Sequence, residues 1–136
     1  MALQFADTGA AAVLTSYFGA TTLTIELFAT NVTPSDTSTK ASFTAAAGGG
    51  YATKTLTGGS WTIGDDGGGI QQAAYAQQTW TFTGALTTNA TIYGYYVYNG
   101  TTLIFAEALS TPFTPANNGD QLSITPIVKA SKGTPT

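Results

Sequence analysis

The sequence predicts an all-β fold, an antiparallel β-sandwich with a jelly roll as one variant, and one short helix near the N-terminus. Two observations lead to this class. Apolar and polar residues alternate along several runs, which is the period of half-buried strands. Asn99-Gly100 stands between two runs rich in aromatic and β-branched residues, and an Asn-Gly pair accepts the positive φ angles of a type I′ hairpin turn. At 136 residues the chain fits one domain over 1–136.

Residues 9–18 are predicted to form the helix. They follow Asp7, whose carboxylate can cap free backbone N–H groups, and they precede Gly19, which can take the left-handed conformation that ends many helices. The apolar face of this helix would carry Val13, Leu14, Tyr17 and Phe18. We expect the helix to close one end of a sheet, which is a structural role.

The first predicted strand covers residues 21–29, where large apolar residues alternate with Thr and Glu. Its inward-facing residues would be Leu23, Ile25 and Leu27. Residues 30–40 are rich in turn-forming residues and predict an irregular loop. Three glycines at 48–50 predict a close crossing of two backbone segments, because the Lys and the following helix of a phosphate-binding loop are missing.

Two short strands are expected at 51–57 and 60–63, joined by a glycine turn as a hairpin. A Gly-rich loop then contains Asp65 and Asp66, the only adjacent acids in the sequence. Two carboxylates in a flexible loop could help to hold Ca²⁺, but the spacing of an EF-hand is missing. We therefore favour a solvated loop tip and expect no metal site.

Two longer strands complete the predicted sandwich around the hairpin. Residues 71–84 predict one strand with Trp80 and Phe82 in the core. Residues 121–128 predict the last strand, and Pro126 marks it as an edge strand or a bulged one, because proline donates no ladder hydrogen bond. Residues 129–136 form a polar tail.

The hairpin at residues 89–109 is apolar on both faces. With a two-residue loop, the opposed pairs would be Tyr98–Thr101, Tyr96–Leu103, Gly94–Phe105 and Ile92–Glu107. The Phe105 ring would then cover the bare backbone of Gly94. One face would carry Ile92, Tyr96, Tyr98, Leu103 and Phe105, and the other Tyr93, Tyr95, Val97, Ile104, Ala106 and Ala108. Because neither face is polar, we expect the hairpin to be covered twice, by its own core and by another layer or subunit.

The composition argues against several classes of function. Charged residues make up 8% of the chain, the net charge is −3, and the sequence lacks Cys, His and Arg. Four Lys cannot form a basic groove, so nucleic-acid binding is not expected. Without His to activate a hydroxyl, and with only Glu26 and Glu107 inside strands, we expect no enzyme and no cofactor. Residues 1–7 lack a basic segment, so we expect no signal peptide, and no apolar stretch is long enough to span a membrane.

Carbohydrate binding is an alternative, since β-sandwiches that bind sugars use exposed aromatic rings beside amide groups. The sequence has seven Tyr and two Trp. Its amide cluster consists of Gln71, Gln72, Gln77 and Gln78. Tyrosines that cover a sheet face or a subunit contact would explain the same composition, and we favour that interpretation.

The chain resembles the small structural proteins of tailed bacteriophages. The likeness lies in the short helix followed by Leu27-Phe28-Ala-Thr-Asn31-Val-Thr-Pro34 and Gly48-Gly-Gly-Tyr51, in Tyr93-Gly94-Tyr95 with Ile104-Phe105-Ala106-Glu107, and in Pro112-Phe113 with Asn118-Gly-Asp120 and Leu122-Ser-Ile-Thr-Pro126. These segments cover most of the chain. The resemblance implies a virion component and brings no catalytic residues.

We therefore expect a capsid decoration or cement protein that binds the major capsid protein on the outer surface of the particle. Low charge and apolar strand faces suit such packing, because burying charge costs more than burying hydroxyl or methyl groups. The expected interface residues are Tyr93, Tyr95, Tyr96, Tyr98, Phe105, Asn31 and Pro34. A homotrimer would suit the local threefold positions of a shell. A tail, neck or fibre component, or a receptor- or glycan-binding module, remains the alternative.

Overall fold

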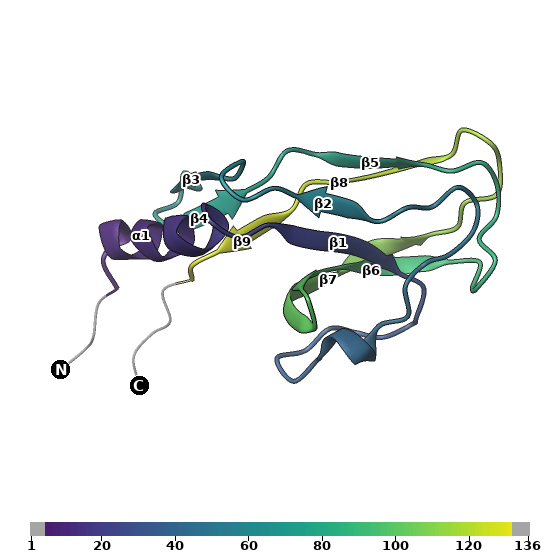
Figure 1. Cartoon of the computed structure of the whole chain (residues 1–136), viewed down its shortest axis with the longest axis horizontal. Coiled ribbons are helices and arrows are strands. Elements are labelled where there is room, and N and C mark those ends of the chain that lie inside the picture. The colour runs from purple at the N-terminus through teal and green to yellow at the C-terminus, as the bar shows by residue number, and fades with distance from the viewer. Residues whose placement is uncertain (1–4, 132–136) are drawn as a thin grey trace. The chain divides into compact units, whose positions relative to one another are not determined.

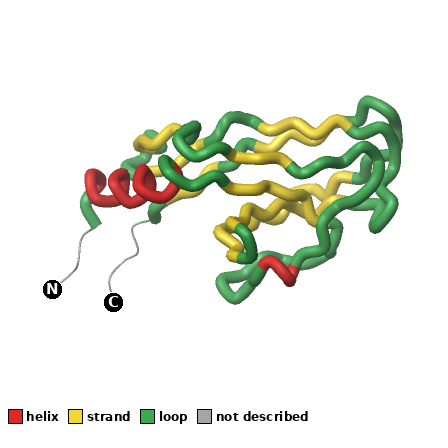
Figure 2. The backbone as a smooth tube through the Cα atoms, viewed as in Figure 1, coloured by secondary structure: helices red, strands yellow, loops and turns green. Residues whose placement is uncertain are grey.

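Antiparallel strands dominate the computed structural model of this chain, which describes residues 5–131 (Figures 1 and 2). The helices are α1 (Asp7–Phe18) and the short 3-10 helix η1 (Lys40–Ser42). The strands are β1 (Leu23–Phe28), β2 (Lys54–Leu56), β3 (Thr62–Asp65), β4 (Gln71–Ala74), β5 (Gln78–Thr81), β6 (Ile92–Asn99), β7 (Thr102–Phe113), β8 (Gln121–Ile124) and β9 (Ile127–Lys129). They form sheets of strand order β2-β1-β6-β7, β3-β4-β9 and β5-β8. The predicted all-β, sandwich-like class with one N-terminal helix is confirmed.

The described residues group into two compact units. Unit 1 falls within Met1–Thr22, Thr57–Gln77 and Thr125–Thr136, and contains α1 and the β3-β4-β9 sheet. Unit 2 consists of Leu23–Leu56 and Gln78–Ile124, and contains the other two sheets. The single domain over 1–136 stays a prediction.

Two strands that were predicted as continuous are each divided between the units. The run 71–84 becomes β4 in unit 1 and β5 in unit 2, and the run 121–128 becomes β8 in unit 2 and β9 in unit 1. Pro126 lies between β8 and β9, is fully buried, and accepts a hydrogen bond on its carbonyl from Tyr75 N at 2.9 Å. The missing proline N–H thus falls at the break, where no ladder bond is lost.

Helix α1 covers the three-stranded sheet of unit 1 through a narrow face. Ala10, Leu14 and Phe18, spaced by four residues, are buried, and the Phe18 ring lies 4.7 Å from that of Trp61. Val13 was expected on this face but is 59% exposed. The ends of the helix differ from the predicted ones, because the helix begins at Asp7 itself and Gly19 is not left-handed. The N-cap residue Ala6 makes no side-chain cap bond, and Gly19 keeps a right-handed φ of −72°.

The carboxylates of Asp65 and Asp66 accept hydrogen bonds from the backbone of the loop that follows them. Asp65 Oδ1 accepts the N–H of Gly67 at 2.6 Å, and Asp66 Oδ1 accepts the N–H of Gly68 at 2.8 Å. Asp66 Oδ2 also forms an ion pair of 2.8 Å with Lys129 Nζ. Lys129 is the last residue of β9, so the expected tail at 129–136 begins inside a strand. Its residues 132–136 lie outside the described part.

The short strands β2 and β3 do not form the hairpin that was expected. Strand β2 pairs with β1 in unit 2, whereas β3 pairs with β4 in unit 1. The intervening glycine turn therefore connects two sheets. Local sequence shows where a strand ends, but the choice of partner depends on contacts far along the chain.

Strands β1 and β6 form the centre of unit 2. The predicted inward-facing residues of β1, Leu23, Ile25 and Leu27, are buried, as are Trp80 and Phe82. Strand β6 is buried on both faces, with Tyr95 and Val97 on one face and Gly94 and Tyr96 on the other. The predicted double cover of the hairpin is present around β6, and the cover comes from this chain itself.

The β6–β7 hairpin has a register that differs from the predicted one. Asn99 pairs with Thr102, Tyr98 with Leu103, Val97 with Phe105, Tyr95 with Glu107 and Gly94 with Ala108. A bulge leaves Ile104 without a partner on β6. Gly100 has a φ of +60°, and no non-glycine residue in the described chain has a positive φ, so Asn99 does not adopt the predicted type I′ turn. The space at Gly94 is filled by the Phe28 ring of β1, and Phe105 does not cover it.

The glycine run at 48–50 makes the predicted backbone crossing. Thr83 N donates to Gly49 O at 2.9 Å, and Thr87 N donates to Ala47 O at 2.8 Å. All three glycines have positive φ angles, and a Cβ on Gly49 would meet the carbonyl oxygen of Gly84. The crossing ties residues 47–50 to residues 83–87 within unit 2.

Candidate functional site

All seven expected interface residues lie in unit 2, but two of them are not accessible. Tyr95 is 3% exposed and Tyr96 is 2% exposed. Both belong to β6, which lies between β1 and β7 in the sheet. Their side chains are almost completely covered within the chain, so they offer little surface to another protein. The five that keep exposed surface are Asn31, Pro34, Tyr93, Tyr98 and Phe105. They lie on the loop and on both sides of the β6–β7 hairpin, and we refer to these five residues together as the loop–hairpin face.

A series of contacting aromatic rings packs against Tyr93 and Tyr98 of this face. The Phe28 and Phe43 centroids are 4.8 Å apart, and the Phe43 and Tyr96 centroids are 5.1 Å apart at an interplanar angle of 19°. Tyr98 continues the series, 5.6 Å from Tyr96. Phe28, Phe43 and Tyr96 form a buried cluster that joins the loop to the sheet.

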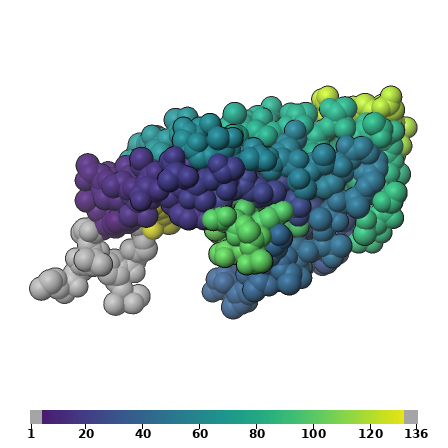
Figure 3. All heavy atoms as spheres, viewed as in Figure 1, coloured from purple at the N-terminus to yellow at the C-terminus, as the bar shows by residue number. Residues whose placement is uncertain are grey.

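Lys40 fastens the loop to the turn of the hairpin. Its Nζ lies 3.5 Å from the centre of the Tyr98 ring and donates to Gly100 O at 3.1 Å. The ammonium group is therefore held by a ring face and by a carbonyl together. Figure 3 shows the loop and the hairpin turn in contact at the molecular surface.

Glu26 of β1 receives hydrogen bonds from two tyrosines of β6. Tyr96 Oη donates to Glu26 Oε2, and Tyr98 Oη donates to Glu26 Oε1 at 3.0 Å. Burial, followed by the neighbouring Glu26 carboxylate, raises the pKa of Tyr96 and that of Tyr98. Both phenols therefore stay protonated at neutral pH and serve as donors, which orients the rings and gives the cluster a structural role.

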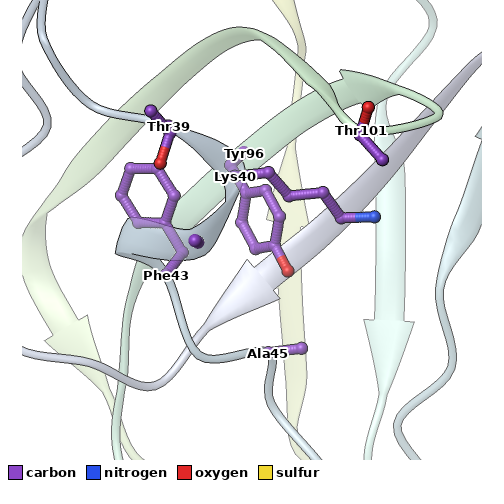
Figure 4. A pocket seen from close by; sticks show the side chains of 7 residues that line it. Thr39, Lys40, Phe43, Ala45, Tyr96 and Thr101 are labelled. Carbon is purple, nitrogen blue, oxygen red and sulfur yellow. The ribbon is translucent and has the colours of Figure 1, made fainter.

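Three hollows open around the loop and the hairpin. The largest has a volume of about 510 Å³ and is lined by Lys40, Phe43, Tyr96 and Thr101 among others (Figure 4). A second, of about 370 Å³, brings Pro34 together with Phe105. The third, of about 390 Å³, brings Asn31 together with Tyr93. The structure thus pairs four of the expected interface residues across segments distant in sequence.

Sequence reasoning missed three residues that organise this region: Glu26, Lys40 and Phe43. Glu26 was placed on the polar side of its strand, where it is in fact shielded by tyrosines. Phe43 and Lys40 lie next to or in η1, in a segment without periodicity. A large aromatic residue beside a polar, turn-rich loop was the available signal, because such a ring is expected to pack against the nearest apolar surface.

Within residues 5–131, no group of three or more His, Cys, Asp or Glu side chains lies close enough to hold a metal ion. Neither helix in this part of the chain has the length and apolarity needed to cross a bilayer.

Comparisons with protein-family models, with curated proteins and with solved structures found no match to this chain.

Proposed function

We propose that this chain is a structural virion protein of a tailed bacteriophage, a decoration protein that binds the outer surface of the capsid and stabilises the shell. The observation that carries the proposal is the loop–hairpin face itself. It presents partly exposed aromatic and amide side chains around three hollows, and Asp36 and Lys40 supply the charge among the described residues that line them. The localisation and the preference for a homotrimer belong to the same proposal.

The physical basis is the low cost of covering such a face. Aromatic rings and methyl groups gain about 25 cal/mol for each Å² of apolar area removed from water. Threonine and asparagine side chains can exchange water for partner hydrogen bonds at little net cost. The Lys40 ammonium group already interacts with the Tyr98 ring and with Gly100 O. A partner that covers this region therefore does not have to desolvate a cation that has no other interaction. A symmetric shell would repeat each modest contact many times.

Binding to empty capsids, measured by co-sedimentation together with light scattering of the free chain, tests the proposal. The wild-type chain should sediment with capsids and should be a trimer in solution. Asn31→Arg places a bulky charge on the loop–hairpin face and should weaken binding by about tenfold or more. Asn117→Arg, on an exposed loop of the same unit, is the matched control and should bind like the wild type.

Two results would contradict the capsid assignment. A monomer that ignores capsids would overturn it, and binding to purified tails instead would transfer the chain to the tail, neck or fibre class. Binding of Asn31→Arg that equals that of the wild type and of Asn117→Arg would show that the contact does not involve Asn31 of the loop–hairpin face.

A glycan-binding function is the second candidate, and the 390 Å³ hollow favours it. Asn31, Asn89 and Tyr93 line this hollow together with Thr30 and Thr91. Asn89 Nδ2 donates to Ala29 O at 2.9 Å. This hydrogen bond fixes the orientation of the side-chain amide, so that its Oδ1 acceptor points away from Ala29 O. Amides, hydroxyls and one ring, with no charged residue among those that line the hollow, suit a neutral sugar. If the function is glycan binding, titration with monosaccharides should shift the NMR signals of these residues.

A further inference from the structure

Strand β7 leaves one edge of its sheet unpaired. The strand order β2-β1-β6-β7 places β7 at the end, and within residues 5–131 it forms ladder bonds with β6 alone. It is 12 residues long, which makes it the longest strand described. An exposed edge of this length offers a row of backbone N–H and C=O groups to any extended chain that approaches.

The 370 Å³ hollow runs along this edge. Its β7 side is formed by four consecutive residues, Leu103 to Ala106, and its other side by Pro34, Ser35, Asp36 and Ser38. Leu103 pairs with Tyr98 and Phe105 pairs with Val97, and these two β6 residues point to opposite faces, so with the bulge at Ile104 the hollow touches residues from both faces of the sheet. A hollow that touches four in a row therefore follows the edge of β7, and we refer to it as the β7 slot.

The β7 slot carries a negative charge. Asp36 is the one charged residue among the described residues that line it, and this exposed carboxylate forms no hydrogen bond or ion pair with any other described residue. The neighbouring serines bond to each other and to Thr37. A partner with a positively charged side chain would complete this side of the slot.

We propose that the β7 slot binds an extended segment of a partner protein as an added strand, with a Lys or Arg of that segment facing Asp36. Backbone hydrogen bonds to Leu103–Ala106 supply affinity, and the charge opposite Asp36 selects the register. The inference rests on the assembly function proposed above, because it takes the occupant to be a protein. Its test uses only peptides, so its failure leaves the capsid-binding test unaffected.

The probe is a short acetylated and amidated peptide in which Thr and Val alternate around a central Lys. Added at millimolar concentration to the ¹⁵N-labelled chain, it should shift the amide signals of Leu103–Ala106 and slow their hydrogen exchange. A peptide of the same sequence with N-methyl groups at alternate residues lacks half of the N–H donors, and it should cause neither effect. Replacing the central Lys by Glu should weaken binding about threefold or more.

Two variants measure how much the charge of Asp36 contributes to peptide binding. Asp36→Asn should weaken binding of the Lys peptide and should remove most of the difference in affinity between the Lys and Glu peptides. Asp65→Asn removes the same charge from the end of β3 in unit 1, keeps an oxygen that can accept the N–H of Gly67, and should leave binding unchanged. Both substitutions are at exposed positions, so the variants should fold.

Three outcomes would overturn the proposal. These are equal binding of the N-methylated peptide, signal shifts confined to residues outside the slot, and no shift at all. Protection of Leu103–Ala106 that grows with protein concentration in the absence of peptide would assign the edge to a second copy of the chain instead.

Discussion

Gly94 shows how one missing side chain sets the centre of unit 2. A Cβ at this position would clash with the Phe28 ring and with the carbonyl oxygen of Glu107. Gly94→Ala should therefore destabilise the protein by about 3 kcal/mol, because a packed core resists added volume. Urea unfolding measures the change. Gly64→Ala is the control, since a Cβ there meets nothing within 4 Å, and its effect should stay within about 0.5 kcal/mol.

Asp66 provides a second test with single residues. The hydrogen bond from Lys129, followed by the backbone N–H groups of Gly68 and Ile70, lowers the pKa of the Asp66 carboxyl to about 2. A lowered pKa in the folded state means that the contribution to stability is complete above the ordinary value of 3.8 and disappears as the pH falls through about 2. Lys129→Gln should raise this pKa toward 3.8, as NMR titration of the carboxyl would record. Lys54→Gln should leave it unchanged.

At the scale of elements, the hairpin turn distinguishes the observed register from the one that the sequence predicts. Gly100 alone has a positive φ in the turn, whereas a type I′ turn would require it at Asn99 as well. Gly100→Ala should cost about 1 to 2 kcal/mol, and Asn99→Ala should cost about 0.5 kcal/mol or less. Thermal unfolding compares the two variants. A large loss of stability in Asn99→Ala would support the predicted type I′ turn instead of the observed one.

The elements also show where prediction from sequence ends. Alternation located β1 and the core residues Trp80 and Phe82, and the aromatic runs located β6 and its two buried faces, because these are local properties of the chain. The bulge at Ile104 shifted the register, and no local pattern marks it. Likewise, the stacking of Phe43 on Tyr96 joins residues that are far apart in sequence. The sequence therefore predicts that the loop is irregular, but it does not predict that the loop packs against β6.

At the scale of the whole molecule, the chain passes between the two units several times. The boundaries fall after Thr22, Leu56, Gln77 and Ile124. The sequence interpretation joined β4 to β5 and β8 to β9 because each pair reads as one run of strand-forming residues. Pro126 is the one local sign of a break, and from the sequence alone it predicts an edge strand or a bulge. Each run is divided because its two halves pair with different strands, and local sequence does not determine which strands pair.

The two units should differ in local stability. In unit 2, Gly94–Tyr98 of β6 pair with both β1 and β7, and five of the eight residues of β6 are buried. In unit 1, β3, β4 and β9 have only three or four residues each, and one of these residues, Ala73, is buried. Local opening is easiest where few apolar contacts are lost. Native-state hydrogen exchange in low concentrations of urea should therefore release the amides of β4 before those of β6. Release of both sets at the same urea concentration would instead mean that the units unfold as one cooperative structure, which would support the single domain predicted from sequence.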